Sequence, residues 1–200
     1  MEIKERIISK ARELFFRYGV KSVTMDDIAN ALGISKKTIY LHFVDKDDIV
    51  FQLISNEISE DKCEWEELEN SSKDVIDRMV KSMELFKQAF AEINPSTFFD
   101  IKKYHPRAWN LFLEHKQNFI LEKIKNDLTE GIKQGVFRAS INVEVLSRMH
   151  LEQIEMGFDP NIFSPSQFSL VEVQLELLDH FIRGVLTEKG TLTYNEYQQK

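Results

Sequence analysis

The chain has 200 residues, of which 42% are hydrophobic and 30% charged, and its 33 acidic and 26 basic side chains give a formal net charge of −7 at pH 7. This composition is typical of a globular protein and excludes a low-complexity or disordered chain. The sequence has no apolar run of about eighteen residues, and its first residues lack the features of a signal peptide, so we expect a cytoplasmic protein. The single cysteine, Cys63, excludes an intrachain disulfide.

The acidic charge is not spread evenly along the chain. Residues 1–50 carry nine basic and eight acidic side chains, a balance of +1, whereas residues 51–200 carry seventeen and twenty-five, a balance of −8. Affinity for DNA phosphates comes largely from Lys and Arg, so the charge of the whole chain argues against nucleic-acid binding. The balance of the first fifty residues removes that objection for the N-terminal part.

Hydrophobic spacing predicts two helices before residue 34. The first covers 4–18, because apolar side chains recur there every three or four positions, and Gly19 follows as a C-terminal stop. The second begins after Thr24, whose side chain and that of Asp27 form a reciprocal cap, and it ends at Gly33.

Two further capping residues predict the next helices. Ser35 caps a helix over 36–43, and Asp45 with Asp48 caps one over 46–62. Gly and Pro positions then separate helices expected at 72–92, 96–104, 106–134, 142–156 and 166–188, with a break at Gly190. The fold class is all-α, with a three-helix N-terminal domain at 1–46 and a C-terminal helical bundle at 47–200.

The tight turn between the second and third predicted helices points to a function. Gly33-Ile34-Ser35 joins two short capped helices at the steep angle of a helix-turn-helix motif, whose second helix enters the DNA major groove. That helix opens with Lys36, Lys37 and Thr38. The N-terminal residues of a recognition helix reach base edges. Tyr40 and His42 follow one turn on and can donate hydrogen bonds to phosphates, which fix register without reading sequence.

Residues from Ile7 to Phe51 resemble the DNA-binding signature of the tetracycline-repressor (TetR/AcrR) family. The matching positions are Gly19, Val23-Thr24, Ile28-Ala29, Gly33-Ile34-Ser35, Thr38-Ile39-Tyr40, His42-Phe43 and Lys46. The resemblance implies phosphate contacts for Tyr40, His42 and Lys46, and it implies that Thr24 anchors the second helix on the DNA backbone. Many members have glycine where this chain has Lys37, so we expect its base contacts to be its own.

The C-terminal part is rich in aromatic residues, most of which must form its core. A bundle whose facing positions combine aromatic side chains with polar groups such as His150 can also hold a small apolar ligand. The residues expected to line this pocket are Phe86, Phe90, Phe99, Trp109, Phe112, His115, Phe119, Met149 and Gln153.

The last predicted large helix indicates a second copy of the chain. Its apolar stripe is too broad for packing on one neighbour, and Gly184 permits close approach. We expect dimerisation through Leu170, Leu177, Phe181, Gly184 and Val185. In the family that the chain resembles, the last two large helices pair with their copies in a four-helix bundle, which implies the same for 142–156 and 166–188.

These features predict a dimeric, sequence-specific repressor that a small hydrophobic ligand releases from a palindromic operator. An adaptor on DNA, whose C-terminal domain recruits a protein partner, is the alternative. Catalysis is not expected, because the sequence has no phosphate loop or nucleophile elbow and Cys63 lies in an acidic stretch. We expect no cofactor and no metal, because the five histidines lack the spacing of a zinc site.

Overall fold

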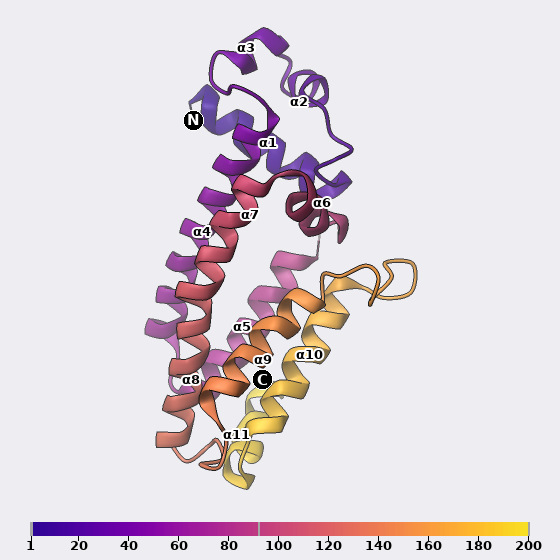
Figure 1. Cartoon of the computed structure of the whole chain (residues 1–200). Helices are drawn as coiled ribbons and strands as arrows, with labels where there is room; N and C mark the ends of the chain where they lie inside the picture. Colours follow the sequence, from indigo (N-terminus) through magenta and orange to yellow (C-terminus); the bar gives the residue numbers. More distant parts are fainter. Residues whose placement is uncertain (1, 92, 200) are drawn as a thin grey trace. The chain divides into compact units, whose positions relative to one another are not determined.

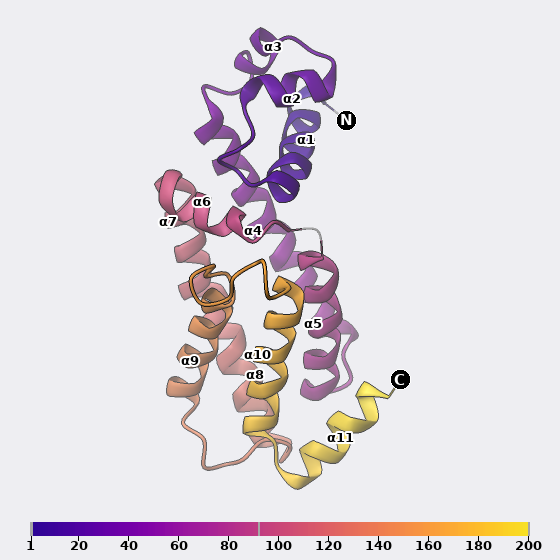
Figure 2. The same ribbon diagram turned by 90° about the vertical axis from the view of Figure 1, so that its right-hand side faces the viewer.

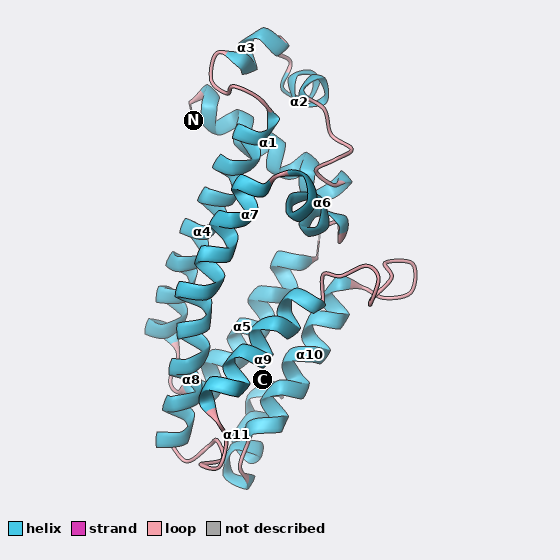
Figure 3. Cartoon of the chain, in the orientation of Figure 1, coloured by secondary structure: helices cyan, strands magenta, loops and turns pink. Residues whose placement is uncertain are grey.

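The computed structural model describes residues 2–91 and 93–199, and every regular element within them is helical (Figures 1 and 3). The prediction of an all-α fold is confirmed. Residues 1, 92 and 200, at which an expected domain or helix begins or ends, lie outside the described residues. The helices are α1 (Ile3–Tyr18), α2 (Met25–Leu32), α3 (Lys36–Tyr40), α4 (Lys46–Ser71), α5 (Val75–Phe90), α6 (Ser96–Tyr104), α7 (Pro106–His115), η1 (Lys116–Ile120), α8 (Leu121–Lys133), α9 (Val143–Met156), α10 (Leu170–Val185) and α11 (Glu188–Gln198). None of these helices is long and apolar enough to cross a membrane.

The described residues form two compact units. The first contains residues 2–61 and 93–113, and the second contains 62–91 and 114–199. The first unit is therefore larger than the N-terminal domain expected at 1–46, because the beginning of α4, all of α6 and most of α7 pack with α1, α2 and α3.

The first unit is built around one apolar core. Ile7 and Phe15 of α1, Ile28 of α2 and Ile39 of α3 are fully buried in it. α6 and α7 add a smaller group of side chains, including the buried Trp109. Burial of a large apolar side chain stabilises a fold by about 1.5–3 kcal/mol, so this core fixes the short helices α2 and α3, which could not persist alone.

The second unit packs α5, α8, α9, α10 and α11 around its own core. α9 lies beside α8 and α10, while α5 contacts α10 and α11 (Figures 1 and 2). Tyr194 joins α11 to this core: its ring is fully buried and its hydroxyl donates to Asp179 of α10 at 2.7 Å.

The helix expected at 106–134 contains a turn that the spacing did not predict. Between α7 and α8, residues 116–120 form a π-helical turn, so the chain stays helical while its hydrogen-bond pattern changes. Such turns are rare and frequently occur at functional sites. Lys116 begins this turn and is buried, with its ammonium bonded to Glu152 and Glu155 of α9.

The expected limits of several helices were wrong: the helix expected at 36–43 ends at Tyr40, and the one expected at 72–92 begins at Val75. α4 continues nine residues beyond 62, to Ser71. The expected helix 166–188 ends at Val185, and a separate α11 then begins, capped by Thr187, whose hydroxyl accepts from the Gly190 amide. Gly190, where the sequence predicted a break, lies inside α11. A Cβ there would come within 2.1 Å of the Val136 carbonyl oxygen, so the glycine allows a close approach of two backbones.

Candidate nucleic-acid interface

The start of α2 is fixed by the reciprocal cap that the sequence predicts. The Thr24 hydroxyl oxygen accepts from the Asp27 amide at 3.2 Å, and the Asp27 carboxylate accepts from the Thr24 amide at 2.8 Å. Hydrogen bonds from Thr24 lower the pKa of Asp27 below its ordinary value. These bonds occupy amides that helix formation alone leaves unpaired, so the first turn of α2 is well defined.

The turn between α2 and α3 is equally specified by local chemistry. Gly33 has φ +66°, a left-handed conformation that favours glycine, and the Ile34 amide donates to the Ala29 carbonyl at 3.0 Å. Ser35 caps α3 by accepting from the Thr38 amide at 3.1 Å. The two capped helices and the turn between them form the helix-turn-helix predicted from the sequence.

The side chains of α3 divide into a buried and an exposed face. Ile39 is fully buried in the core of the first unit, as is Phe43 just beyond the helix. Lys37, Tyr40 and His42 are exposed, and their side chains form no hydrogen bond or ion pair with the described residues. They are therefore available to a ligand outside the unit.

Several of the other side chains expected to contact DNA already have partners. The Lys36 ammonium donates to Asp26 at 2.8 Å, which raises the pKa of this exposed lysine. The Thr38 hydroxyl lies 2.8 Å from that of Ser35. An exposed ion pair of this kind contributes little to stability, so Asp26 holds Lys36 only weakly.

Lys46 has a structural partner that the sequence did not reveal. Its ammonium donates to the carbonyl oxygens of Val20 and Val23, in the turn between α1 and α2. Desolvation lowers the pKa of this half-buried lysine, while Asp100 and Asp27 act in the opposite direction. Lys46 therefore ties α4 to that turn, and the expected phosphate contact stays a prediction.

The segment containing α6 holds the same turn from another direction. Asp100 accepts from the Lys21 amide at 2.8 Å, and the Thr97 hydroxyl donates to the Phe15 carbonyl at 3.1 Å. At the end of α6, His105 Nδ1 lies 2.9 Å from the Asp47 carboxylate of α4. These partners are 58 to 82 residues apart in sequence, so no local pattern could have predicted them.

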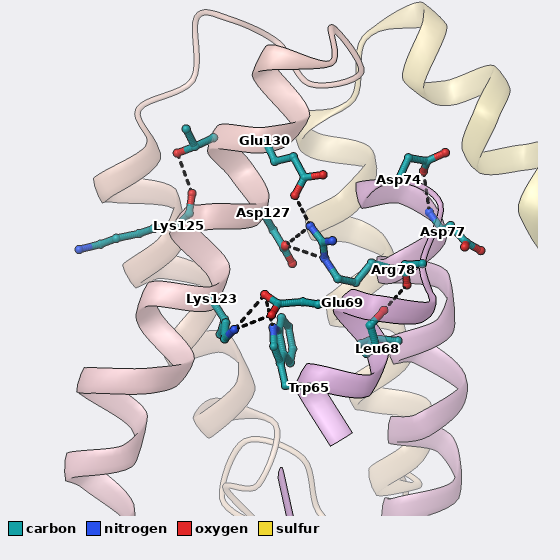
Figure 4. Close-up of polar contacts among 12 residues, drawn as sticks. Trp65, Leu68, Glu69, Asp74, Asp77, Arg78, Lys123, Lys125, Asp127 and Glu130 are labelled. Carbon is teal, nitrogen blue, oxygen red and sulfur yellow. Dashed lines mark hydrogen bonds and ion pairs between the residues drawn. The ribbon is translucent and has the colours of Figure 1, made fainter. Parts of the chain in front are cut away.

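The second unit holds a cluster of charges around Arg78 of α5. Its guanidinium donates to Asp127 at 2.7 and 2.9 Å and also to Glu130, both on α8 (Figure 4). Nearby, Glu69 near the end of α4 accepts from Lys123 of α8 at 2.8 Å and from the Trp65 indole. The cluster joins the last turns of α4 to α5 and α8 within the second unit.

The residues expected to line a ligand pocket are divided between the two units. Phe99, Trp109 and Phe112 belong to the first unit, whereas Phe86, Phe90, His115, Phe119, Met149 and Gln153 belong to the second. In the second unit, Phe90 lies against both Phe86 and Phe158, with ring centroids 5.8 and 5.4 Å apart.

Two polar groups on α9 stand out in that unit. His150 Nδ1 and Gln153 Oε1 are buried and form no hydrogen bond of normal geometry with the described residues, although the Gln153 side chain lies close enough to His150 to oppose the lowering of its pKa. Burial lowers the pKa of His150 to about 4, so its ring is neutral near pH 7, and it stacks on Phe181 with centroids 3.9 Å apart. Buried polar atoms are almost always paired, which makes this position a candidate for contact with a bound molecule.

The residues expected at a dimer interface occupy different environments within the second unit. Leu170, Phe181 and Val185 are buried in the unit itself, and Leu177 is half-buried. Gly184 is exposed, and a Cβ there would meet nothing within 4 Å. Val145 and Met149 of α9, four residues apart, are also exposed.

A capped helix-turn-helix with an exposed second helix, built on a core of its own, defines a DNA-binding regulator of the helix-turn-helix class. Residues 7–53 match the family model described as bacterial regulatory proteins, tetR family. The HTH-type transcriptional regulator YvaF of Bacillus subtilis is 28% identical over 92% of this chain and 96% of its own length. Residues 7–53 thus match the DNA-binding part of the tetR family, and over nearly its whole length the chain is similar to TetR-family transcriptional regulators.

Solved structures show the same fold over nearly the whole chain. A TetR-family regulator from Agrobacterium tumefaciens has a TM-score of 0.76 at 17% identity, covering 92% of this chain and 97% of its own. The regulator FadR from Bacillus subtilis, in complex with stearoyl-CoA, has a TM-score of 0.64 at 19% identity, covering 90% and 98%. The relatives are regulators rather than enzymes, which agrees with the sequence.

Proposed function

We propose that this TetR-family regulator is a dimeric repressor that binds a palindromic operator and leaves it when a small apolar ligand binds the second unit. The observation that carries the proposal is the exposed side of α3 and the residues just after it, where the side chains of Lys37, Tyr40 and His42 form no hydrogen bond or ion pair with the described residues. A helix presented in this way fits the major groove.

The side chains around α3 take different parts in this proposal. Lys37 contacts a base, because it lies on the helix that enters the groove and a lysine can donate to guanine O6 and N7. Tyr40 and His42 donate to phosphates, which positions the helix. Lys36, Thr38, Thr24 and Lys46 support the same contact, the last two mainly by fixing α2 and the turn before it.

Two considerations support the proposed dimer, the geometry of an operator and the surface of α9 and α10. Two recognition helices must enter successive major grooves about 34 Å apart. Val145 and Met149 are exposed apolar side chains on the surface of α9, and Gly184 on the surface of α10 has nothing within 4 Å of the position of a Cβ. A second copy covering these residues would form an isologous interface, and the operator would then be a palindrome.

A ligand in the second unit is supported by two observations. His150 and Gln153 carry buried polar atoms that form no hydrogen bond of normal geometry with the described residues, and His150 stacks on the aromatic ring of Phe181. FadR, a structural neighbour, binds stearoyl-CoA. A ligand needs to favour the non-binding state by about 1–3 kcal/mol to change operator affinity roughly 5- to 150-fold.

The test begins with selection of bound fragments from random duplex DNA, followed by fluorescence anisotropy with the selected duplex and sedimentation of the free protein. We expect a palindromic site, a dimer at micromolar concentration and nanomolar binding. Lys37→Ala should change the selected sequence, while Lys133→Ala on α8 serves as a matched loss of one exposed lysine. Selection of no sequence would contradict DNA recognition, and a monomer would contradict the dimer.

The ligand is tested separately, by thermal shift of the full chain with a panel of apolar metabolites and acyl-CoA thioesters. A compound that binds should also lower the affinity of the protein for its operator. The His150→Phe variant should bind that compound more weakly than the wild type. If none of the compounds shifts the midpoint or releases DNA, the adaptor alternative gains support, since Ile162 and Phe168 in the segment before α10 are exposed apolar side chains.

A further inference from the structure

The exposed apolar side chain at the end of α3 belongs to Leu41. It is 74% exposed, although it lies directly after the helix that the proposed function places in the major groove. A single exposed leucine is ordinary on a protein surface, so the exposure alone carries no function. The position of Leu41 relative to Lys37 is the observation that indicates a role in DNA binding.

Lys37 and Leu41 share one face of the helix. Leu41 keeps helical backbone angles, φ −74° and ψ −19°, so the geometry of α3 continues through it. Residues four apart lie on the same side of a helix, and successive residues are turned by about 100°. On this count Lys37 and Leu41 lie about 160° and 200° from the buried Ile39, which makes them the outward face of α3.

The chemistry of this outward face is one cation and one hydrocarbon. Lys36 is paired with Asp26, and the Thr38 hydroxyl with Ser35, so they contribute less to it. Leu41 can neither donate nor accept a hydrogen bond, and it therefore cannot bind a phosphate. What it can contact favourably on DNA is an apolar group.

The major groove offers one prominent apolar group on a base edge, the C5-methyl of thymine. We propose that Leu41 packs on a thymine methyl and so sets an A·T preference in each operator half-site. The inference rests on the proposed function, because it requires α3 to lie in the groove. Four residues of helix rise about 6 Å, and base pairs are about 3.4 Å apart, so this thymine lies within about two base pairs of the base that Lys37 contacts.

The test removes the methyl alone. Each thymine of the selected operator is replaced by deoxyuridine, which keeps the base pair, and affinity is measured by anisotropy. A replacement in one half-site should weaken wild-type binding about fourfold, the value expected for burial of one methyl-sized group. In Leu41→Ala, the same replacement should change affinity less than about 1.5-fold, since the partner of the methyl is gone.

Two variants serve as controls. Val44→Ala removes a side chain that is 81% exposed but lies beyond α3, and it should keep the fourfold effect. Lys37→Ala should weaken operator binding, but the deoxyuridine replacement should still lower the affinity of this variant about fourfold. Because Leu41 is exposed, its variant should retain the wild-type circular dichroism and unfolding midpoint.

The proposal is overturned if no deoxyuridine replacement weakens wild-type binding, or if Leu41→Ala keeps the effect. It is also overturned if Val44→Ala removes the effect, or if the sensitive thymine lies more than two base pairs from the position altered in Lys37→Ala. Each of these results leaves sequence-specific binding intact. Failure of the proposed function looks different, because wild-type protein would then select no operator at all.

Discussion

Replacing Asp127 by Asn tests whether burial or ion pairing dominates the charge cluster of the second unit. The Asp127 side chain is 7% exposed and accepts two hydrogen bonds from Arg78. Burial raises the pKa of this carboxyl from 3.8 to about 6, although the Arg78 cation acts in the opposite direction. Asn keeps an oxygen acceptor for Arg78 but removes the titration.

The sign of the effect follows from the direction of the pKa shift. The folded protein holds the Asp127 proton more tightly than the unfolded chain, so the stabilisation by this group is complete below pH 4 and is lost as pH rises through 6. A shift of about two units corresponds to about 3 kcal/mol of unfolding free energy. Asp77, whose pKa is lowered, changes stability in the opposite sense, so the useful quantity is the difference between protein and variant.

The assay is urea unfolding between pH 4 and 7.5, followed by Trp65 fluorescence. The chain has two tryptophans, and Trp109 lies in the first unit, so a Trp109→Phe background makes the signal specific to the second unit. Relative to Asp127→Asn, the parent should lose about 3 kcal/mol as pH rises from 4 to 7. Parallel curves, or a parent that gains relative stability with rising pH, would refute the dominance of burial over pairing.

Three further changes have distinct expected results. Tyr40→Phe should weaken binding to every DNA sequence about equally and leave the selected site unchanged, as measured by anisotropy on operator and random duplexes; an altered site would contradict a phosphate contact. Lys46→Met should destabilise the first unit by about 1–3 kcal/mol, read from Trp109 fluorescence during urea unfolding, because the Val20 and Val23 carbonyls lose a charged donor; unchanged stability would show that water replaces it. Gly190→Ala should lower the melting temperature, because its Cβ would collide with the Val136 carbonyl. Gly184→Ala should leave the melting temperature of the monomer unchanged or raise it slightly, and it should weaken the dimer in sedimentation. A larger loss of melting temperature in Gly184→Ala than in Gly190→Ala would contradict both assignments.

The helix-turn-helix was predictable from the sequence because its determinants are local. Thr24 with Asp27, Gly33 and Ser35 act on amides and carbonyls within five residues, and each makes the predicted bond or conformation. The same holds for the helix at 96–104, whose expected ends match α6. Local chemistry of this kind carries its signal in the order of the residues.

The features that sequence reasoning missed depend on partners distant in the chain. Asp100 reads as one more acidic residue until its bond to the Lys21 amide is known. Gly190 reads as a break until the Val136 backbone is placed against it. The spacing of four residues between Lys37 and Leu41 places both on one face of the helix. An apolar side chain does not by itself indicate contact with DNA, so Leu41 was not assigned to the interface from the sequence.

The bonds between α6 and the turn after α1 have a consequence for protein engineering. A hybrid regulator that takes residues 1–46 of this chain and the remainder from another would leave Thr97 and Asp100 behind. The Phe15 carbonyl and the Lys21 amide would then lose their partners inside the grafted piece. A DNA-binding module that can be transferred from this chain is therefore discontinuous in sequence, and it has to include residues 93–113 together with the N-terminal helices.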